Sequence, residues 1–331
     1  MAKFSGRKVA VGIGLEATKG TPVAPEYWYP HLDLSIKDAD TALYNESALG
    51  TIIKSNDKVT TLVAGDGSVS GKMFIKGIYY FLSLVFGKKP ATTPVTGDTN
   101  AKSHNFTLQD DNQHLSATLA IKEPNLDVRF PYALPESFTI TWSPDSYPKI
   151  EFPIKSRRSV TATNTVAYVV DKEFLPKHAQ LRIADKLAGL AAAPALTDIK
   201  SFTLTFTKTL SPQQTMPTGT ANEVTYSEIL NTDFEVSGSF EKLYNDTTYR
   251  GYVLNDAVKA MRFTLSDPQN MAGNTTPTSL TIDISRAAFG SREPSYGLSD
   301  ISTETINFAM LLDVEDFSKS VTATLVNKYT Y

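Results

Sequence analysis

Residues 201–207, Ser-Phe-Thr-Leu-Thr-Phe-Thr, alternate polar and apolar side chains with a period of two. Successive side chains of a β-strand point to opposite faces, so this pattern predicts a strand with one buried face. Segments 31–37, 137–142 and 279–284 alternate in the same way. Pro, Gly, Asn and Asp separate such segments along most of the chain, which is typical of turns. The sequence therefore predicts a fold made mostly of β-strands.

Length and composition limit the class of protein. The chain has 331 residues, which suggests about two domains, and it is 41% hydrophobic and 20% charged, as in soluble globular proteins. A net charge of −3 argues against a protein that grips nucleic acid through a basic face. The absence of cysteine excludes disulfides and thiolate sites. With no apolar signal segment or membrane-length apolar run, we expect a soluble protein made inside a cell.

Four short segments recur in the same order in the two halves of the chain. The pairs are 69–71 with 236–238, 106–110 with 263–267, 135–140 with 277–282, and 159–163 with 320–324. Their separations differ only by loop-sized insertions, and a colinear set of this kind indicates an internal repeat. The sequence therefore predicts a tandem duplication, with a first module over 1–165 and a second over 166–331.

Each half contains one predicted helix, directly after its Val-Ser-Gly strand. The first, 74–86, is apolar nearly all round, and Gly87 after it favours the left-handed C-terminal cap. The second, 247–261, is amphipathic, with Asp246 as a candidate N-cap. One helix packed on a sheet in each module predicts an α+β fold that is mostly β.

Four other segments lie between the predicted strands. Segment 88–104 is long and polar, which indicates a loop. Segment 187–196 is rich in Ala and Leu, and its short apolar run is compatible with a short helix or with a loop. Segment 38–57 is a polar connection between two strands, and 210–231 is its counterpart in the second half.

The sequence shows no catalytic, cofactor-binding or metal-binding constellation. Residues 12–17 fit a loose G-x-G-x-x-A dinucleotide pattern, but 18–25 carries Gly and two Pro residues and cannot form the helix that this pattern requires. The four histidines lack the paired spacing of a metal site, and no G-x-S-x-G nucleophile motif is present. Asp110-Asp111-Asn112 indicates a tight Asx turn rather than a calcium loop. The basic cluster 155–158 suits a strand end or a subunit contact. We therefore expect a non-enzymatic, structural protein.

The N-terminal run 6–21, Gly-Arg-Lys-Val-Ala-Val-Gly-Ile-Gly-Leu-Glu-Ala-Thr-Lys-Gly-Thr, resembles the opening of the tail tube (major tail) proteins of tailed bacteriophages. The order of the segments that follow is similar to that family: Trp28-Tyr29-Pro30, then 45–50, then a Gly-Ser-Val-Ser-Gly strand that leads into an apolar helix. The resemblance is clearest over residues 6–90, and 134–139 continues it.

The resemblance implies two tandem tail-tube-like β-sandwich or barrel modules, each with one flanking helix. In that family, modules stand side by side in a ring and contribute strands to a continuous barrel, and rings stack into the tube through which the genome leaves the capsid. Most members carry one module and form hexamers, so a duplicated chain predicts a trimer with pseudo-sixfold symmetry. The implied partners are other copies of the chain and the tape measure, tail terminator and distal tail proteins. DNA would pass without specific binding. The protein would be made in the host cytoplasm and would reside in the virion tail.

The same resemblance gives roles to particular residues. We expect segments 38–57 and 210–231 to carry apolar anchors for contact between stacked rings, with a loop folded back on its own module as the alternative. The candidate anchors are Tyr44, Leu49, Ile52, Ile53, Tyr226, Ile229 and Leu230. An anionic lumen would repel the phosphates of DNA. We expect Asp66, Asp233 and Glu235, on the strands before the helices, to face that lumen.

Two alternatives differ in class from a tube subunit of this kind, and a third stays close to it. A two-domain β-sandwich adhesin or surface-binding protein would usually carry a signal peptide or calcium loops. A hydrolase would need a nucleophile and base. A tube of a contractile or secretion-type particle would share the same module and add a sheath as partner.

Overall fold

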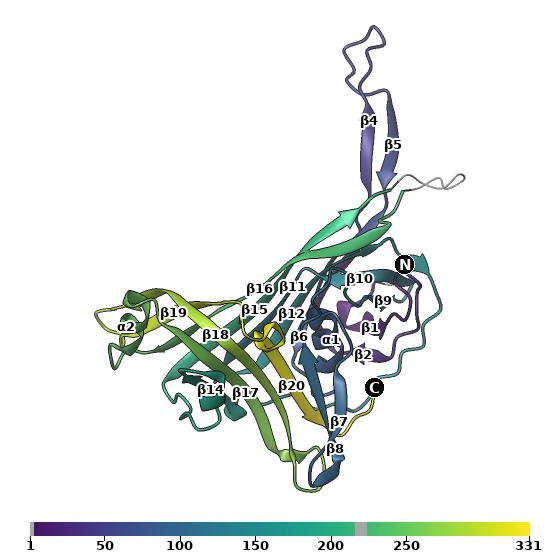
Figure 1. The fold of residues 1–331 in the computed structure, drawn as a ribbon. Helices are drawn as coiled ribbons and strands as arrows, with labels where there is room; N and C mark the ends of the chain where they lie inside the picture. The colour runs from purple at the N-terminus through teal and green to yellow at the C-terminus, as the bar shows by residue number, and fades with distance from the viewer. Residues whose placement is uncertain (1–2, 216–223) are drawn as a thin grey trace.

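The computed structural model describes residues 3–215 and 224–331, and strands dominate it (Figure 1). This confirms the predicted fold class, α+β and mostly β. In the first half the elements are η1 (Gly6–Lys8), β1 (Ala10–Leu15), β2 (Tyr27–Tyr29), β3 (His31–Asp38), β4 (Thr41–Asn45), β5 (Asp57–Leu62), β6 (Ala64–Lys72), α1 (Ile78–Phe86), β7 (Ala91–Val95), β8 (Asp98–Thr107), β9 (Ala117–Lys122), β10 (Asp127–Pro135), β11 (Ser137–Ser143), β12 (Ser146–Arg157) and β13 (Val160–Thr161).

The second half repeats this composition with longer strands. Its elements are η2 (Pro176–His178), β14 (Ala179–Ala184), η3 (Leu187–Gly189), β15 (Ile199–Gln213), β16 (Glu228–Leu243), α2 (Thr248–Leu254), β17 (Val258–Met271), β18 (Pro277–Ser295), β19 (Thr303–Met310), η4 (Phe317–Lys319) and β20 (Val321–Asn327). None of the helices in the described ranges is long and apolar enough to cross a membrane.

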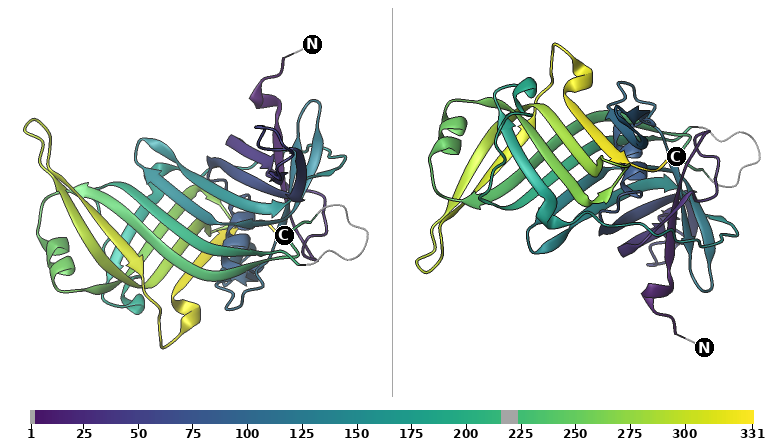
Figure 2. Two further views of the ribbon diagram at one scale, coloured as in Figure 1. Left: turned by 90° about the horizontal axis from the view of Figure 1, so that it is seen from above. Right: turned by 90° about the horizontal axis from the view of Figure 1, so that it is seen from below.

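One antiparallel sheet runs through both halves, in the order β3-β6-β12-β11-β15-β16-β19-β18. Figure 2 shows its long strands lying side by side across the molecule. A second layer consists of β2-β1-β9-β10-β13 in the first half and β14-β17-β18-β20-β8-β7 in the second. β10 and β18 belong to both layers, so all these strands form one connected network.

The order of strand pairings occurs twice. In the long sheet, β3-β6-β12-β11 corresponds to β15-β16-β19-β18, and in the second layer β1-β9-β10-β13 corresponds to β14-β17-β18-β20. Each half places its helix after the second strand of the long sheet. This repetition supports a duplicated module, and the division at 165/166 stays a prediction because the β11–β15 pairing carries the sheet across it.

Two of the four recurring segments lie on corresponding strands, and two do not. The 69–71 and 236–238 pair lies on β6 and β16, and the 159–163 and 320–324 pair lies at β13 and β20. By contrast, 106–110 begins at the end of β8, which pairs with β20, whereas 263–267 lies in β17, the counterpart of β9. The 135–140 segment spans the β10–β11 junction, while 277–282 begins β18. Alternation of Thr with apolar residues is common to many strands, so it produces such matches out of register.

The helix boundaries differ from the predicted ones. α1 begins four residues later than predicted, its nine residues are all buried, and Gly87 ends it with φ 81° as expected for a left-handed cap. α2 covers only Thr248–Leu254, because 258–261 already pairs with β14 and β18 as the start of β17. Asp246 Oδ1 accepts a bond from the Thr248 N–H at 2.8 Å, although Thr247 occupies the N-cap position.

The predicted loop at 88–104 is instead a β-hairpin, β7–β8. β8 pairs with β20 of the second half, and Ala101 and His104 are buried under it. The polar composition is explained by the exposed edge strand β7, whose residues 91–94 are exposed. Segment 187–196 contains only the short η3 turn rather than an α-helix.

The G-x-G pattern at Gly12 and Gly14 has a packing explanation. Both glycines lie in β1, where a Cβ atom on Gly14 would stand 2.5 Å from the Ala24 carbonyl oxygen and one on Gly12 would stand 2.6 Å from Pro25 Cβ. The segment before β2 therefore approaches β1 more closely than other residues permit. The following Glu16 is buried, and its carboxylate accepts bonds from Gly20 N, Ser116 Oγ, Thr118 Oγ1 and Tyr132 N.

A buried lysine from the second half joins the two halves at the first helix. The Lys208 ammonium on β15 donates to the Leu84 carbonyl oxygen in the last turn of α1 at 2.5 Å, and its backbone N–H donates to Glu136 O at 2.8 Å. Cationic groups are favourable at a helix C-terminus. Complete burial nevertheless lowers the pKa of Lys208 well below its usual value.

Lys208→Met should therefore change how stability depends on pH. Because the pKa of Lys208 is lowered on folding, the unfolded chain binds more protons between the folded pKa and about pH 10, so stability rises with pH in that window. We expect denaturant unfolding between pH 7 and about pH 8.5 to show this rise for the natural chain and a weaker one for Lys208→Met. At higher pH the buried tyrosines, such as Tyr27 and Tyr29, oppose it because burial raises their pKa values. Lys149→Met, on the exposed face of β12, is the matched control and should retain the rise.

Candidate assembly surfaces

One face of the eight-stranded sheet is mostly polar, with a few apolar residues such as Pro153 and Ala309 among its polar side chains. The apolar side chains of each strand point to the core, as do Val69, Phe206 and Val236, so the residues between them lie on the opposite face. Cross-strand contacts connect side chains there: Ser35 with Ser68 at 3.1 Å, Thr139 with Thr205 at 3.1 Å, and Asn307 Nδ2 with Ser291 Oγ at 2.8 Å. On the alternation and register, this polar face comprises Asp33, Ser35, Lys37, Asp66, Ser68, Ser70, Lys149, Glu151, Lys155, Ser137, Thr139, Thr141, Thr203, Thr205, Thr207, Thr209, Asp233, Glu235, Ser237, Ser239, Glu241, Thr305, Asn307, Ser291 and Glu293.

The three acidic residues singled out in the sequence lie on this same polar face, in both halves. Asp66 stands in register with Lys37 and Lys155 on the neighbouring strands, and Asp233 and Glu235 are exposed on β16. Lys155 also forms an ion pair with Glu136 at 2.6 Å, which raises the pKa of Lys155. Whether the polar face lines a lumen depends on assembly, so the role of the three carboxylates stays a prediction.

The sheet ends in an open edge on each side. β3 pairs with β6 along one side, and no strand in 3–215 or 224–331 pairs with its other side. At the opposite end, β18 pairs with β19 over residues 287–295, and the last pairing on its other side is Val258 with Ala288. Residues 289–295 of β18 and most of β3 therefore present unpaired backbone donors and acceptors, which is the template for pairing with another chain.

The segment predicted as a polar loop at 38–57 is part of a two-stranded hairpin, β4–β5. Figure 1 shows this hairpin projecting away from the rest of the molecule. The four candidate anchors on it are exposed, from 58% for Tyr44 to 105% for Ile52, with Leu49 and Ile53 between them. Leu43 and Val59, which the sequence did not single out, are also exposed there. Apolar side chains gathered on a projecting element mark an interaction surface.

The counterpart at 210–231 is the tip of the β15–β16 hairpin, of which 216–223 lie outside the described residues. Tyr226 and Leu230 are half-buried, whereas Ile229 is buried against Tyr132 and Leu134. Ile229 therefore has no free surface in the single chain to offer another subunit. The prediction that Ile229 contacts another ring was based on its residue type alone. Residue type does not reveal that side chains of the first half cover Ile229.

Arg157, from the predicted basic cluster, fixes the base of that second hairpin. Its guanidinium donates to the carbonyl oxygens of Tyr226 and Ser227, both at 2.8 Å, and lies over the Tyr132 ring at 5.0 Å. A planar group with several donors suits two adjacent carbonyls. The cluster therefore includes a structural contact between the two halves of one chain.

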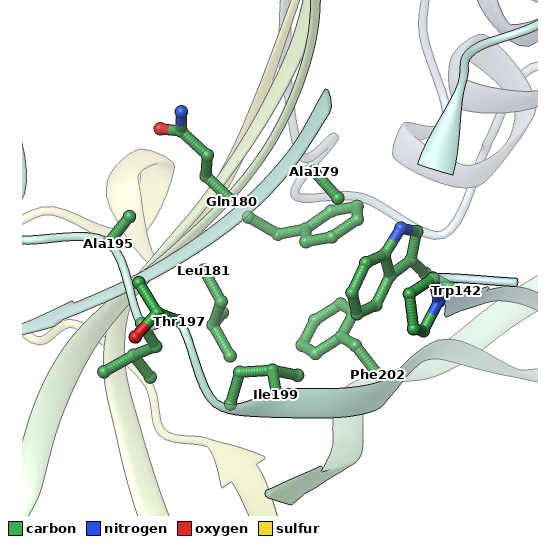
Figure 3. Close-up of a pocket in the computed structure, with 11 residues that line it drawn as sticks. Trp142, Ala179, Gln180, Leu181, Ala195, Thr197, Ile199 and Phe202 are labelled. Carbon is green, nitrogen blue, oxygen red and sulfur yellow. The ribbon is translucent and has the colours of Figure 1, made fainter. Parts of the chain in front are cut away.

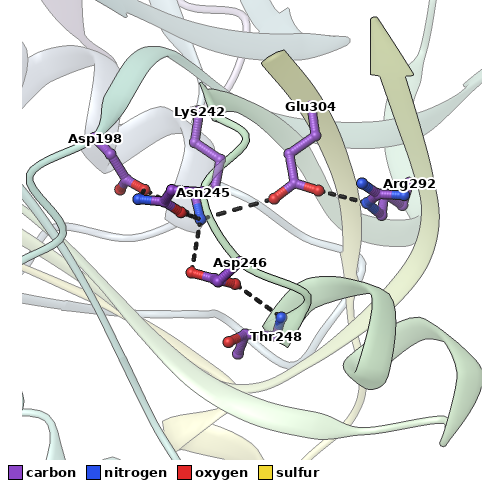
Figure 4. A network of polar contacts seen from close by, with 7 residues as sticks. All are labelled: Asp198, Lys242, Asn245, Asp246, Thr248, Arg292 and Glu304. Atoms are coloured by element: carbon purple, nitrogen blue, oxygen red, sulfur yellow. Dashed lines mark hydrogen bonds and ion pairs between the residues drawn. The ribbon is translucent and has the colours of Figure 1, made fainter. Parts of the chain in front are cut away.

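A network of charged residues connects β16 with α2, β18 and β19 in the second half (Figure 4). Lys242 Nζ on β16 is buried and contacts Asp198 at 3.1 Å, Asp246 at 3.2 Å and Glu304 at 3.7 Å. Burial lowers the pKa of Lys242, but the bonds and charges of Asp198 and Asp246 outweigh it, so the pKa is raised overall. Glu304 also forms a short contact with Arg292 of β18. The network thus ties β16, α2, β18 and β19 together.

A pocket lies where the first half meets the second (Figure 3). Trp142 from β11 forms one wall, and residues of β14 and β15 form the others, among them Leu181, Ile199 and Phe202. The Trp142 indole N–H donates to the Pro176 carbonyl oxygen at 2.9 Å, which fixes the ring. The pocket is thus a consequence of contact between the halves, and its few polar groups do not form a catalytic arrangement.

Other candidate groups do not gather into a site. Within the described ranges, no three His, Cys, Asp or Glu side chains come together in a way that could hold a metal ion. Asp111 accepts a bond from the Gln113 N–H at 2.8 Å, as in an Asx turn. His114 packs under α1, where burial lowers its pKa to about 4.

Comparison with known proteins gives one match. The family model described as phage tail tube protein matches residues 6–310 of the 331. A search of curated proteins finds no match to the chain.

Proposed function

This chain belongs to the phage tail tube protein family, and we propose that its copies close into rings that stack to form the tube for genome ejection. Its structural role in the phage tail follows from the family. The observation that carries the proposal is the eight-stranded sheet, which is polar on its free face and open at both edges.

Ring closure is supported by a junction already present inside the chain. β11 of the first half pairs with β15 of the second, and these two strands correspond to the C-terminal part of β18 and to β3. If β18 of one copy pairs with β3 of the next, each new junction repeats the internal one. Three chains with two modules each, divided near 165, would then fill six positions in a closed ring and leave no open edge.

The polar face is the one available to line the lumen. The other face packs against α1 and the second layer through side chains such as Phe138, Phe152 and Phe206. Ser, Thr and dispersed carboxylates including Asp66, Asp233 and Glu235 would then surround passing DNA. Such a surface provides little attraction for phosphates, so a duplex can slide.

Stacking of rings is supported by the projecting β4–β5 hairpin. Its exposed Tyr44, Leu49, Ile52 and Ile53 would bury against the neighbouring ring, with Tyr226 and Leu230 at the base of the second hairpin as secondary contacts. The tape measure, tail terminator and distal tail proteins would be the partners at the lumen and the two tube ends.

The purified protein should form rings or hollow tubes at high concentration. Negative-stain microscopy, with cross-linking followed by mass determination, gives both the shape and the number of chains per ring. We expect a central pore and covalent species up to three chains. A protein that stays monomeric at every concentration would contradict the proposal, and six chains per ring would contradict the trimer.

Replacing Leu49, Ile52 and Ile53 together by Ser should separate stacking from ring closure. Because these side chains are exposed in the single chain, the fold should persist while tubes shorten to single rings. Replacing Leu126 and Val170, which are also exposed but lie elsewhere, by Ser is the matched control. Long tubes in the triple variant, counted by microscopy, would rule out this role of the hairpin.

Glu235→Lys combined with Asp233→Lys should make the tube retain DNA. Two added cations on the polar face of each chain would attract phosphates, with an affinity that falls steeply as salt is raised. The measurement is binding of a short labelled duplex to assembled tubes. Glu315→Lys, away from this face and exposed, serves as control and should bind no more than the natural tube.

A further inference from the structure

The contact between the two halves of one chain includes more than strand pairing. The end of β11 and the turn that follows it carry Trp142 and Pro144, which pack at the open end of the second half between β14 and β15 (Figure 3). The bond from Trp142 to Pro176 O places this turn against η2, the short helix directly before β14. A turn of one module thus docks beside the N-terminal 3-10 helix of the next.

The first half has the corresponding receiving surface without a turn in it. η1 precedes β1 as η2 precedes β14, and a groove lies beside it at the start of β3. The groove is lined by Gly6, Arg7, Val9, Pro30, His31, Leu32 and Tyr168. Leu32 is 57% exposed, so the groove presents apolar surface that nothing in the described chain covers.

The turn that corresponds to β11–β12 is the one between β18 and β19, residues 296–302. It is longer, and it carries Leu298 at 108% exposure and Ile301 at 80%. Its base is held firmly: the Tyr296 ring lies 6.0 Å from that of Tyr244, and Arg292 is fixed by Glu304 in the network of Figure 4. Two fully exposed aliphatic side chains on an anchored turn indicate a surface that is covered in the assembly.

We propose that the β18–β19 turn of one copy docks into the η1 groove of the next copy, as the β11–β12 turn docks beside η2 within the chain. This inference rests on the proposed function, because it requires copies arranged side by side. It adds a second contact to edge pairing. Leu298 and Ile301 meet the apolar surface of Val9, Pro30 and Leu32 in this arrangement.

Charge supports the same pairing of surfaces. The turn carries the exposed Asp300, and η1 carries Arg7 and Lys8 in its single turn. The two surfaces are therefore complementary in both apolar character and charge, which favours one orientation of neighbouring copies. Edge pairing of strands alone leaves register open, and a docked turn fixes it.

Leu298→Asp tests the apolar part of the contact. We expect the concentration needed for ring formation to rise about tenfold or more, measured by sedimentation and microscopy, with unchanged thermal unfolding of the monomer. Val314→Asp, at an exposed residue beyond the end of β19 that lies away from this turn, is the matched control and should assemble normally. Normal assembly of Leu298→Asp would overturn the inference while leaving the tube function intact; failure of the natural chain to assemble would instead overturn that function.

A charge exchange and a cross-link test the specific partners. Asp300→Arg and Arg7→Asp should each weaken assembly severalfold, and the double variant should recover it; no recovery would overturn the pairing. Since the chain has no cysteine, Leu298→Cys with Arg7→Cys allows a single type of link by a bifunctional maleimide. We expect links between chains under assembly conditions, ending at the closed ring, and none for Leu298→Cys with Val314→Cys. Equal linking in both pairs would contradict the docked arrangement.

Discussion

The assembly that we propose depends on unpaired backbone groups at the two edges of one sheet. Within residues 3–215 and 224–331, the N–H and C=O groups on the outer side of β3 and of the last residues of β18 have no strand partner. Such edges are a liability in a monomer, because any other edge can pair with them. Here the two edges lie at opposite ends of the same sheet. In the assembly that we propose, they would pair as β11 and β15 pair within the chain. The liability is thereby converted into the means of assembly that we propose.

The duplicated module makes the single chain a partial copy of its proposed assembly. One junction between modules is visible within the chain, with its strand pairing, the docked Trp142 and the buried Lys208 beneath α1. The two modules are not identical at that junction. Ile36 on β3 occupies the position that Lys208 occupies on β15. Each lies two residues after the residue that pairs with the equivalent valine, Val69 in the first half and Val236 in the second. Junctions inside a chain therefore carry a buried amine that junctions between chains would lack.

Sequence patterns predicted much of the fold because the alternation of side chains reports directly on burial. The Thr-Phe and Thr-Leu repeat of β15 specifies one polar and one apolar face, and Asp66, Asp233 and Glu235 were recognised as candidates for the polar side. Tertiary pairing overrode local preference elsewhere. The helix predicted to extend to Met261 ends at Leu254, because residues 258–261 pair with β14 and β18 instead. The polar segment 88–104 forms a hairpin, because its second strand pairs with β20.

By itself the sequence determined the mostly β composition and placed apolar side chains in the connection 38–57, since each depends on local order along the chain. It indicated a repeat, but only two of the four recurring segments lie on corresponding strands. Only the tertiary structure decided that the halves share one sheet, that Ile229 is covered by Tyr132, and that Trp142 packs against residues of β14 and β15. The physical reason is that strand pairing and burial depend on residues distant in the chain, whereas periodicity records only which side of a strand is apolar.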